Sequence, residues 1–192
     1  MNEFRKQYSE EYLAEIRKIL DLTQVDLITG IDKVASMLKK ARENKNTVFL
    51  MGNGGSAATA SHVAQDLAKC TIAEGLPRFK VISLTDSIPS MLAWANDASY
   101  EEIFIEQLKN LMAPGDVVIG LSGSGNSMNV IKAIEYANSH GGLTIGLSGY
   151  DGGKLSKCAR ESIHVPSSNM QRVEDMHLMA LHLLISLLRD EK

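Results

Sequence analysis

An α/β fold built on a parallel sheet is predicted by two features of the sequence: five short apolar runs, and the helical stretches that separate them. The runs are nearly continuous in apolar residues, as expected of strands that are buried on both faces of a sheet. Strands that alternate with helices join as parallel neighbours through right-handed crossovers. The five strands are expected at Val48–Met51, Val81–Leu84, Val117–Leu121, Leu143–Leu147 and Ser162–Val165.

The composition is that of an ordinary globular protein. The 192 residues are 44% hydrophobic and 22% charged, enough for one domain with a full core. The net charge of −3 and the lack of a long basic run argue against nucleic acid as a partner. No apolar run approaches the roughly 20 residues that a membrane helix needs, and the first residues lack the apolar core of a signal peptide. Cys70 and Cys158 have no metal or redox spacing, so we expect buried or free thiols in a cytoplasmic protein.

Residues 1–45 are expected to form an N-terminal helical hairpin. Glu10–Leu22 and Gln24–Glu43 each carry apolar residues on one side at helical spacing. A helical hairpin with one apolar face needs a partner, either its own domain or another subunit, and we expect a subunit contact. The chain therefore divides into this extension and a ligand-binding domain at 46–192.

The remaining helices fill the gaps between the strands. The last one, Gln171–Arg189, has a wide apolar band and is expected to be buried between the domain and a partner. The others are expected at Ala57–Lys69, Ser90–Asn96, Glu101–Leu111 and Met128–Ala137.

The loop Gly120–Ser127, with the sequence GLSGSGNS, is the most distinctive stretch of the chain. It places the hydroxyls of Ser122, Ser124 and Ser127 between a strand and the start of a helix. Backbone N–H groups, hydroxyls and the positive end of a helix can together hold a phosphate. The loop contains no lysine, so it is not a nucleoside-triphosphate loop. A small sugar phosphate is the ligand that we expect.

A second glycine-rich turn, Gly52–Ser56 with the sequence GNGGS, also follows a strand. Its glycine spacing differs from the dinucleotide-binding fingerprint. A tight turn with Ser56 as the helix N-cap is the alternative to ligand contact. Because parallel sheets bind ligands at the carboxyl ends of their strands, we expect both loops to face the same crevice.

Two helices carry histidine and carboxylate residues that suit chemistry. His62 and Asp66 lie one turn apart, and Glu174 and His182 lie on the last helix. This set suits a divalent metal such as zinc, although a polar helix face and a core histidine are the plainer interpretations. Glu174 and His182 are about 12 Å apart along a straight helix. They would therefore meet at one ion most easily across a subunit interface, or else His182 acts on another part of the ligand.

With these motifs placed, the chain resembles the sugar isomerase (SIS) domain family, and within it the phosphoheptose isomerases. The resemblance covers nearly the whole chain. Besides the two loops and the helical N-terminus, it rests on Asn96-Asp97, on Gly149-Tyr-Asp-Gly-Gly153, and on Arg172-Val-Glu-Asp-Met-His177 followed by His182. It implies a three-layer α/β/α sandwich, usually assembled as a homotetramer with active sites between subunits.

The resemblance also implies a reaction. It is the aldose–ketose isomerisation of sedoheptulose 7-phosphate to D-glycero-D-manno-heptose 7-phosphate through an enediol(ate), which serves lipopolysaccharide or capsule synthesis. Zinc is implied at His62, Asp66, Glu174 and His182, with Asp66 as general base and His182 as general acid. The residues implied to bind substrate are Asn53, Gly54, Gly55, Ser56, Asp66, Asn96, Asp97, Ser122, Gly123, Ser124, Ser127 and Glu174.

The chain departs from the family pattern at three of these positions. Asp66 stands where the family has glutamate, Glu174 where it has glutamine, and Gly123 where it usually has threonine. The shorter Asp66 draws its carboxylate back from the substrate, which can lower the rate about 100-fold. The extra charge of Glu174 favours a metal-dependent variant or, without metal, a proton shared between two carboxylates. The alternatives are a non-catalytic phosphosugar-binding adaptor or sensor, and an isomerase of another phosphosugar.

Overall fold

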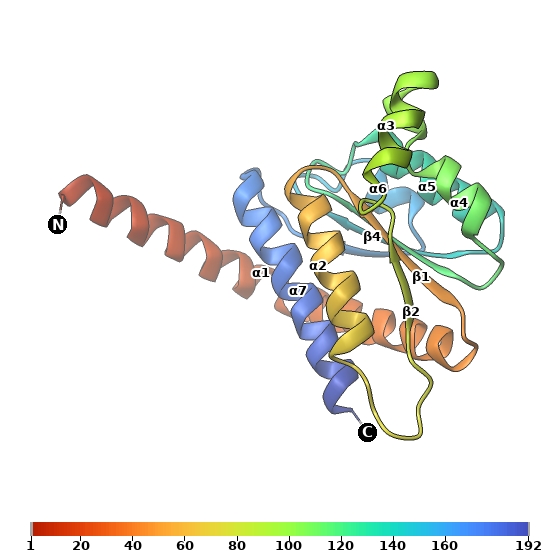
Figure 1. Cartoon of the computed structure of the whole chain (residues 1–192). Coiled ribbons are helices and arrows are strands. Elements are labelled where there is room, and N and C mark those ends of the chain that lie inside the picture. Colours follow the sequence, from red (N-terminus) through yellow and green to blue (C-terminus); the bar gives the residue numbers. More distant parts are fainter. Residues whose placement is uncertain (1, 192) are drawn as a thin grey trace.

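The computed structural model describes residues 2–191, and these contain a five-stranded parallel sheet between two layers of helices (Figure 1). The strand order is β2-β1-β3-β4-β5, and every neighbouring pair is parallel. The expected α/β class and all five expected strands are confirmed. The strands are β1 (Thr47–Gly52), β2 (Lys80–Ser83), β3 (Val117–Ser122), β4 (Leu143–Ser148) and β5 (Glu161–His164).

The helices are divided between the two faces of the sheet. One face is covered by α1 (Glu3–Glu43), α2 (Gly55–Lys69) and α7 (Met170–Asp190). The opposite face is covered by α4 (Ile105–Leu111), α5 (Met128–Ser139) and α6 (Leu155–Cys158). The short helix α3 (Ile88–Asp97) has no buried residue and projects at the top of Figure 1, and η1 (Tyr100–Glu102) follows it.

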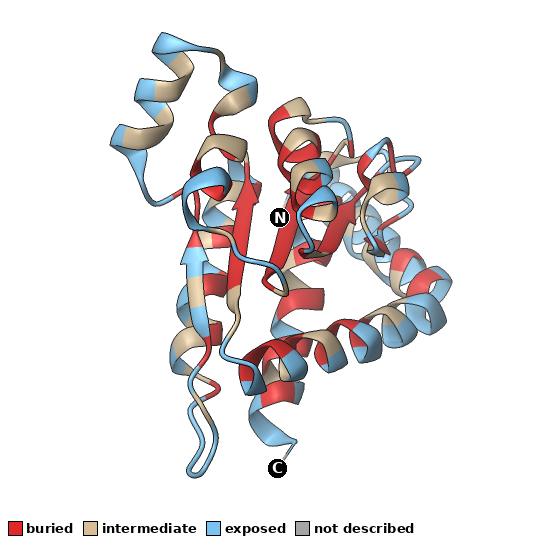
Figure 2. Cartoon of the chain, turned by 90° about the vertical axis from the view of Figure 1, so that its right-hand side faces the viewer, coloured by how far each residue is buried: buried red, intermediate tan, exposed pale blue. Residues whose placement is uncertain are grey.

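The central strands are unbroken apolar runs in the sequence because both of their faces are buried. Along β1, Val48 and Leu50 belong to the core under α1, α2 and α7, whereas Phe49 and Met51 belong to the core under α4 and α5. All four side chains are fully buried. Figure 2 shows the central strands as buried and the outer surfaces of the helices as exposed. This double burial is what made the strands predictable from the sequence.

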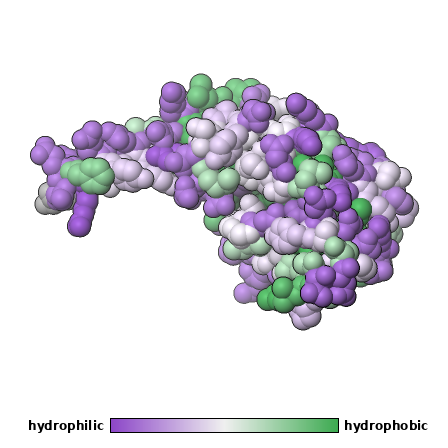
Figure 3. Space-filling model, turned by 90° about the horizontal axis from the view of Figure 1, so that it is seen from above, coloured by the Kyte–Doolittle hydropathy of each residue, from purple (hydrophilic) through white to green (hydrophobic). Residues whose placement is uncertain are grey.

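The expected N-terminal hairpin is wrong, because α1 is one continuous helix of 41 residues. No glycine or proline lies near the supposed turn at residue 23, so nothing ends the helix there. Thr23 is instead a buried residue in the middle of the helix, and its hydroxyl donates to the carbonyl of Ile19 over 2.8 Å. The first half of α1 projects from the body as an arm with a mixed surface of polar and apolar side chains (Figures 1 and 3). Among residues 2–191, no helix combines the length and apolar character needed to cross a bilayer.

Three smaller details also differ from expectation. The expected helix at Glu101–Leu111 is split into η1 and α4, and the four-residue α6 was not expected. Ser56 is not the N-cap of α2, because the helix begins at Gly55 and Gly54 takes the cap position with a φ of +54°. Ser56 is therefore a buried residue in the first turn of α2.

One histidine is buried beside the carboxyl end of β4. His177 of α7 is 1% exposed, and neither of its ring nitrogens makes a hydrogen bond of good geometry with the described residues. Desolvation lowers the pKa of this imidazole to about 4, although the Ser148 carbonyl opposes the shift. The folded protein therefore holds His177 neutral well below the usual histidine range.

This burial predicts a specific pH dependence of stability. An unfolded histidine takes up its proton near pH 6.5, whereas folded His177 does so only near pH 4. The unfolded state binds more protons between these values, so the free energy of unfolding falls by about 3 kcal/mol on acidification through this window. We expect His177→Leu to remove that part of the pH dependence in urea unfolding measured from pH 7 to pH 4. The exposed His140→Leu should keep the wild-type profile; matching profiles for the two variants would contradict the assignment.

Candidate functional site

The two glycine-rich loops lie side by side because β1 and β3 are neighbours in the sheet. Gly52 at the end of β1 pairs with Leu121 near the end of β3. The chain leaves β1 into α2 on one face and leaves β3 into α5 on the other, so a crevice opens between the loops, as is usual at such switch points. Both loops line it, as expected. The crevice has a volume of about 250 Å³ and is lined by Asn53, Gly54, Gly55, Ser56, Leu121, Ser122, Gly123, Ser124, Ser127, Met170 and Glu174.

The serine loop is organised by its own hydrogen bonds. The buried Ser122 hydroxyl lies 2.9 Å from the Ser127 hydroxyl. Gly125 has a φ of +67°, and its N–H donates to the Ser122 carbonyl, which closes the turn. Ser127 takes the N-cap position of α5, but its hydroxyl makes no capping bond. The positive end of α5 is therefore not capped by that side chain, and together with the hydroxyls it suits an anion such as phosphate.

Two crevice residues are glycines because side chains of α7 approach them closely. A Cβ atom on Gly123 would overlap the sulfur of Met170. A Cβ atom on Gly55 would lie 2.6 Å from Oε2 of Glu174, which is too close for contact. The Glu174 carboxylate thus reaches the first loop and brings a negative charge into the crevice.

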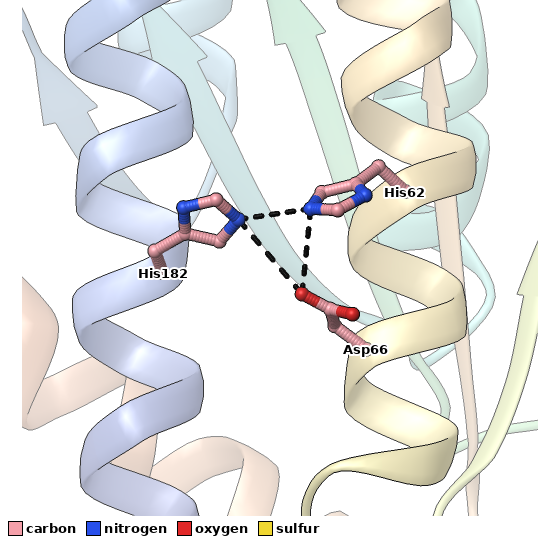
Figure 4. A group of neighbouring side chains, drawn as sticks. All are labelled: His62, Asp66 and His182. Carbon is pink, nitrogen blue, oxygen red and sulfur yellow. Dashed lines mark hydrogen bonds and ion pairs between the residues drawn. The ribbon is translucent and has the colours of Figure 1, made fainter.

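A second group of polar side chains lies further along α2. His62 and Asp66 point toward His182 of α7 (Figure 4). The Nε2 atoms of the two histidines are 2.9 Å apart. Oδ2 of Asp66 lies 3.4 Å from Nε2 of His62 and 3.8 Å from Nε2 of His182. The Cys70 thiol donates to the other oxygen, Oδ1, over 3.8 Å. The carboxylate is thereby oriented with Oδ2 toward the two imidazoles.

These three side chains fit a divalent metal. Their ligand atoms lie within 4.8 Å of one another, and the ligands of a tetrahedral zinc, bound at about 2.0–2.1 Å, lie about 3.3 Å apart. Two imidazoles and one carboxylate form a donor set that catalytic zinc sites use with one position left open. Both histidine side chains are just under half exposed, so solvent reaches the group.

Glu174 lies outside this group, although the sequence suggested it as a fourth ligand. It stands two helical turns before His182, and its carboxylate contacts Gly55 instead. One chain therefore brings together three of the four suggested ligands.

Asn96 and Asp97 are not brought to the crevice either. They end α3, are exposed, and bond to each other, since the Asn96 amide donates to the Asp97 carboxylate over 2.8 Å. Neither residue is among those that line the crevice.

Sequence reasoning missed three residues that shape the crevice. Met170 lines the crevice from the first position of α7, one residue before the expected start of that helix. Tyr100 and Asn129 both bond to Asn53. Asn129 stands two residues after the serine loop, four residues before Ala133 on the buried side of α5, and a polar residue at that helical spacing was the one signal that the sequence offered.

Comparison with known proteins places this arrangement in a family. The family model of the SIS domain matches residues 11–149. The phosphoheptose isomerase of Aliarcobacter butzleri is 36% identical over 95% of each chain, and that of Nitratiruptor sp. is 37% identical over 95% of this chain and 97% of its own. The solved structure of a phosphoheptose isomerase from Francisella tularensis superposes with a TM-score of 0.89 and 26% identity over the whole of both chains.

The histidine–aspartate group predicts how the protein binds metal. We expect chelator-treated protein to bind about one Zn²⁺ per chain at pH 7.5 in calorimetry. His182→Ala removes one of three ligands and should weaken Zn²⁺ binding at least about 10-fold, the lower end of what even an outer-shell contact is worth. Glu174→Gln and the distant His140→Ala should leave the affinity unchanged. Equal affinity in wild type and His182→Ala would contradict this site.

Proposed function

This chain belongs to the SIS domain family and is a phosphosugar isomerase, and on that premise we propose that it interconverts sedoheptulose 7-phosphate and D-glycero-D-manno-heptose 7-phosphate. The observation that carries the proposal is that one helix, α2, borders both groups of polar residues. It starts at the crevice of the two loops and carries His62 about 9 Å further along its axis than Ser56. The phosphate and the reacting carbons of one sugar would then be held by different groups.

The serine loop is the proposed phosphate site. The hydroxyls of Ser122, Ser124 and Ser127, with the N-terminus of α5, would bind the phosphate, and Gly54 and Gly55 would let the backbone approach the sugar. Binding energy from the phosphate end would orient the reacting end of the substrate. We assign substrate contacts also to Asn53, Ser56, Gly123 and Glu174. Asn96 and Asp97 lie outside the crevice of one chain, so their proposed contacts would be made in an active site between subunits.

The chemistry is assigned to Asp66 and His182. Asp66 would remove the proton from the carbon next to the carbonyl, which gives an enediol(ate), and would return it to the neighbouring carbon. With no metal bound, His182 would serve as the acid for the sugar oxygens; with a metal bound, its Nε2 would be a ligand instead. His62, which lies 3.4 Å from Asp66 Oδ2, would keep the carboxylate in place. A divalent metal held by His62, Asp66 and His182, which we propose to be zinc, would stabilise negative charge on the sugar oxygens.

We further propose that the protein works as a homo-oligomer, a tetramer with active sites between subunits, in the cytoplasm and in heptose synthesis for lipopolysaccharide or capsule. Residues 1–45 would serve as the oligomer contact and residues 46–192 as the phosphosugar-binding domain. The support is the arm of α1, where Phe4, Tyr8 and Leu13 are all more than half exposed. A second copy of the chain is the partner that would cover them.

Asp66→Asn tests the assignment of the base. The amide keeps the size of the side chain but cannot accept the proton, so kcat should fall by about 10²- to 10⁴-fold with little change in KM for sedoheptulose 7-phosphate. The measurement is formation of the aldose phosphate with and without Zn²⁺. Transfer of deuterium from D₂O into the product should disappear in parallel.

Asp32→Asn, at an exposed aspartate of α1, serves as the matched control and should keep wild-type activity. If wild-type protein binds the heptose phosphate but forms no product in either condition, the protein is a phosphosugar-binding module and the catalytic assignment is wrong.

A further inference from the structure

A small network of side chains joins the two loops of the crevice to the segment that follows α3. Asn53, in the first loop, and Asn129, in the first turn of α5, bond reciprocally: each Nδ2 donates to the other's Oδ1, over 3.0 and 2.9 Å. The hydroxyl of Tyr100, in η1, donates to Asn53 Oδ1 over 2.9 Å. Three elements that are far apart in the sequence therefore meet at one amide group.

The orientation of both amides follows from a single backbone group. The N–H of Val130 can only donate. It is shared between Asn129 Oδ1, over 2.9 Å, and the Ser127 carbonyl, over 3.1 Å, and it would face the amide hydrogens if Asn129 were turned the other way. Asn129 must therefore turn its oxygen toward Val130, which leaves its Nδ2 to donate to Asn53. Asn53 must then present Oδ1 to Asn129, and the Tyr100 hydroxyl donates to the same oxygen. A backbone donor thus fixes, through Asn129, which way Asn53 faces.

This orientation decides what Asn53 can offer a ligand. A side-chain amide has two acceptor lone pairs and two donor hydrogens. Tyr100 and Asn129 use both lone pairs of Asn53 Oδ1, and Asn129 uses one hydrogen of Nδ2. One Nδ2 hydrogen remains, on a half-buried residue that lines the crevice. Asn53 therefore meets a ligand as a donor and not as an acceptor.

Charged contacts hold Tyr100 in place. Lys132, one turn after Asn129 on α5, lies 2.7 Å from Glu101 and 2.8 Å from Glu102, the two residues after Tyr100. The amide network and these ion pairs thus attach η1 to the first two turns of α5. Asn129 itself is 2% exposed, so the network is anchored in the core at one end and open to the crevice at the other.

We propose that Tyr100 and Asn129 are positioning residues that set Asn53 as a hydrogen-bond donor to an acceptor oxygen of the bound sugar phosphate. The inference rests on the proposed function, because it takes a sugar phosphate as the ligand of the crevice. It adds a determinant of specificity: Asn53 binds a ligand oxygen that accepts a hydrogen bond, and a ligand group that must donate a hydrogen bond at this position is disfavoured.

The test is a double-mutant cycle between Tyr100 and Asn53. Tyr100→Phe removes only the hydroxyl, and one hydrogen bond corresponds to about 2- to 10-fold in affinity. We expect KM for sedoheptulose 7-phosphate to rise by that factor, with kcat within about twofold of wild type. In an Asn53→Ala background, Tyr100→Phe should change KM no further, because Tyr100 acts through Asn53. Tyr136→Phe, whose ring stacks on His140 at the C-cap of the same helix, is the matched control and should change neither constant.

Additive effects of Tyr100→Phe and Asn53→Ala, or a Tyr100→Phe effect no larger than that of Tyr136→Phe, would overturn the proposal. A failure of the isomerase assignment gives a different result. If wild type binds sedoheptulose 7-phosphate without turnover, the same cycle is measured in the dissociation constant by calorimetry, with the same expected non-additivity. If wild type does not bind this sugar phosphate at all, the donor role of Asn53 is also wrong.

Discussion

The pairing of β1 with β3 is the constraint on which the rest of the structure depends. Their paired ends bring the two loops together, and a glycine at each end lets the next helix come close. A Cβ atom on Gly52 would lie 2.7 Å from the Cβ of Ser56 in α2, and one on Gly120 would lie 2.7 Å from Val130 in α5. Both helices can therefore pack close to the strands that precede them. The crevice, the exposed start of α5 and the position of His62 along α2 all follow from that close approach.

The crevice lacks a cationic side chain among the residues that line it, and its one charged group is the Glu174 carboxylate. A phosphate would therefore be held by hydroxyls, backbone N–H groups and the helix end alone, which favours a monoester over a triphosphate. Glu174 would repel the phosphate, so the phosphate belongs on the serine side and the sugar hydroxyls belong toward Glu174. The donor-only face of Asn53 stands in the same crevice and fits acceptor oxygens of either part.

Much of the fold could be predicted because strand burial leaves a direct trace in the sequence. A continuous run such as Val48–Met51 reports burial on two faces, and the glycine–serine loops mark where such runs end. The single long helix α1 could not be predicted, because an amphipathic pattern reports which face of a helix is buried and not where the helix ends.

The candidate site was also predictable only in part. His62 and Asp66 lie one helical turn apart, so their spacing predicted that they act as a pair. The distance along the helix likewise predicted that Glu174 and His182 lie apart. The link from Tyr100 to Asn53 and Asn129 left no trace, since 47 and 76 residues separate Asn53 from these partners.

The exposure of the group formed by His62, Asp66 and His182 bears on how the enzyme could work. Both histidine side chains are nearly half exposed in the single chain. Electrostatic stabilisation of an enediolate is strongest where water is excluded, so an efficient isomerase needs a cover over this group. The arm of α1 extends away from the chain's own body and leaves its apolar residues uncovered. A neighbouring copy would therefore satisfy two needs at once, burial of the arm and exclusion of water from the site. The proposed assembly is in this sense part of the proposed chemistry: the fold of one chain would align the reacting groups, and the contact between chains would exclude water from them.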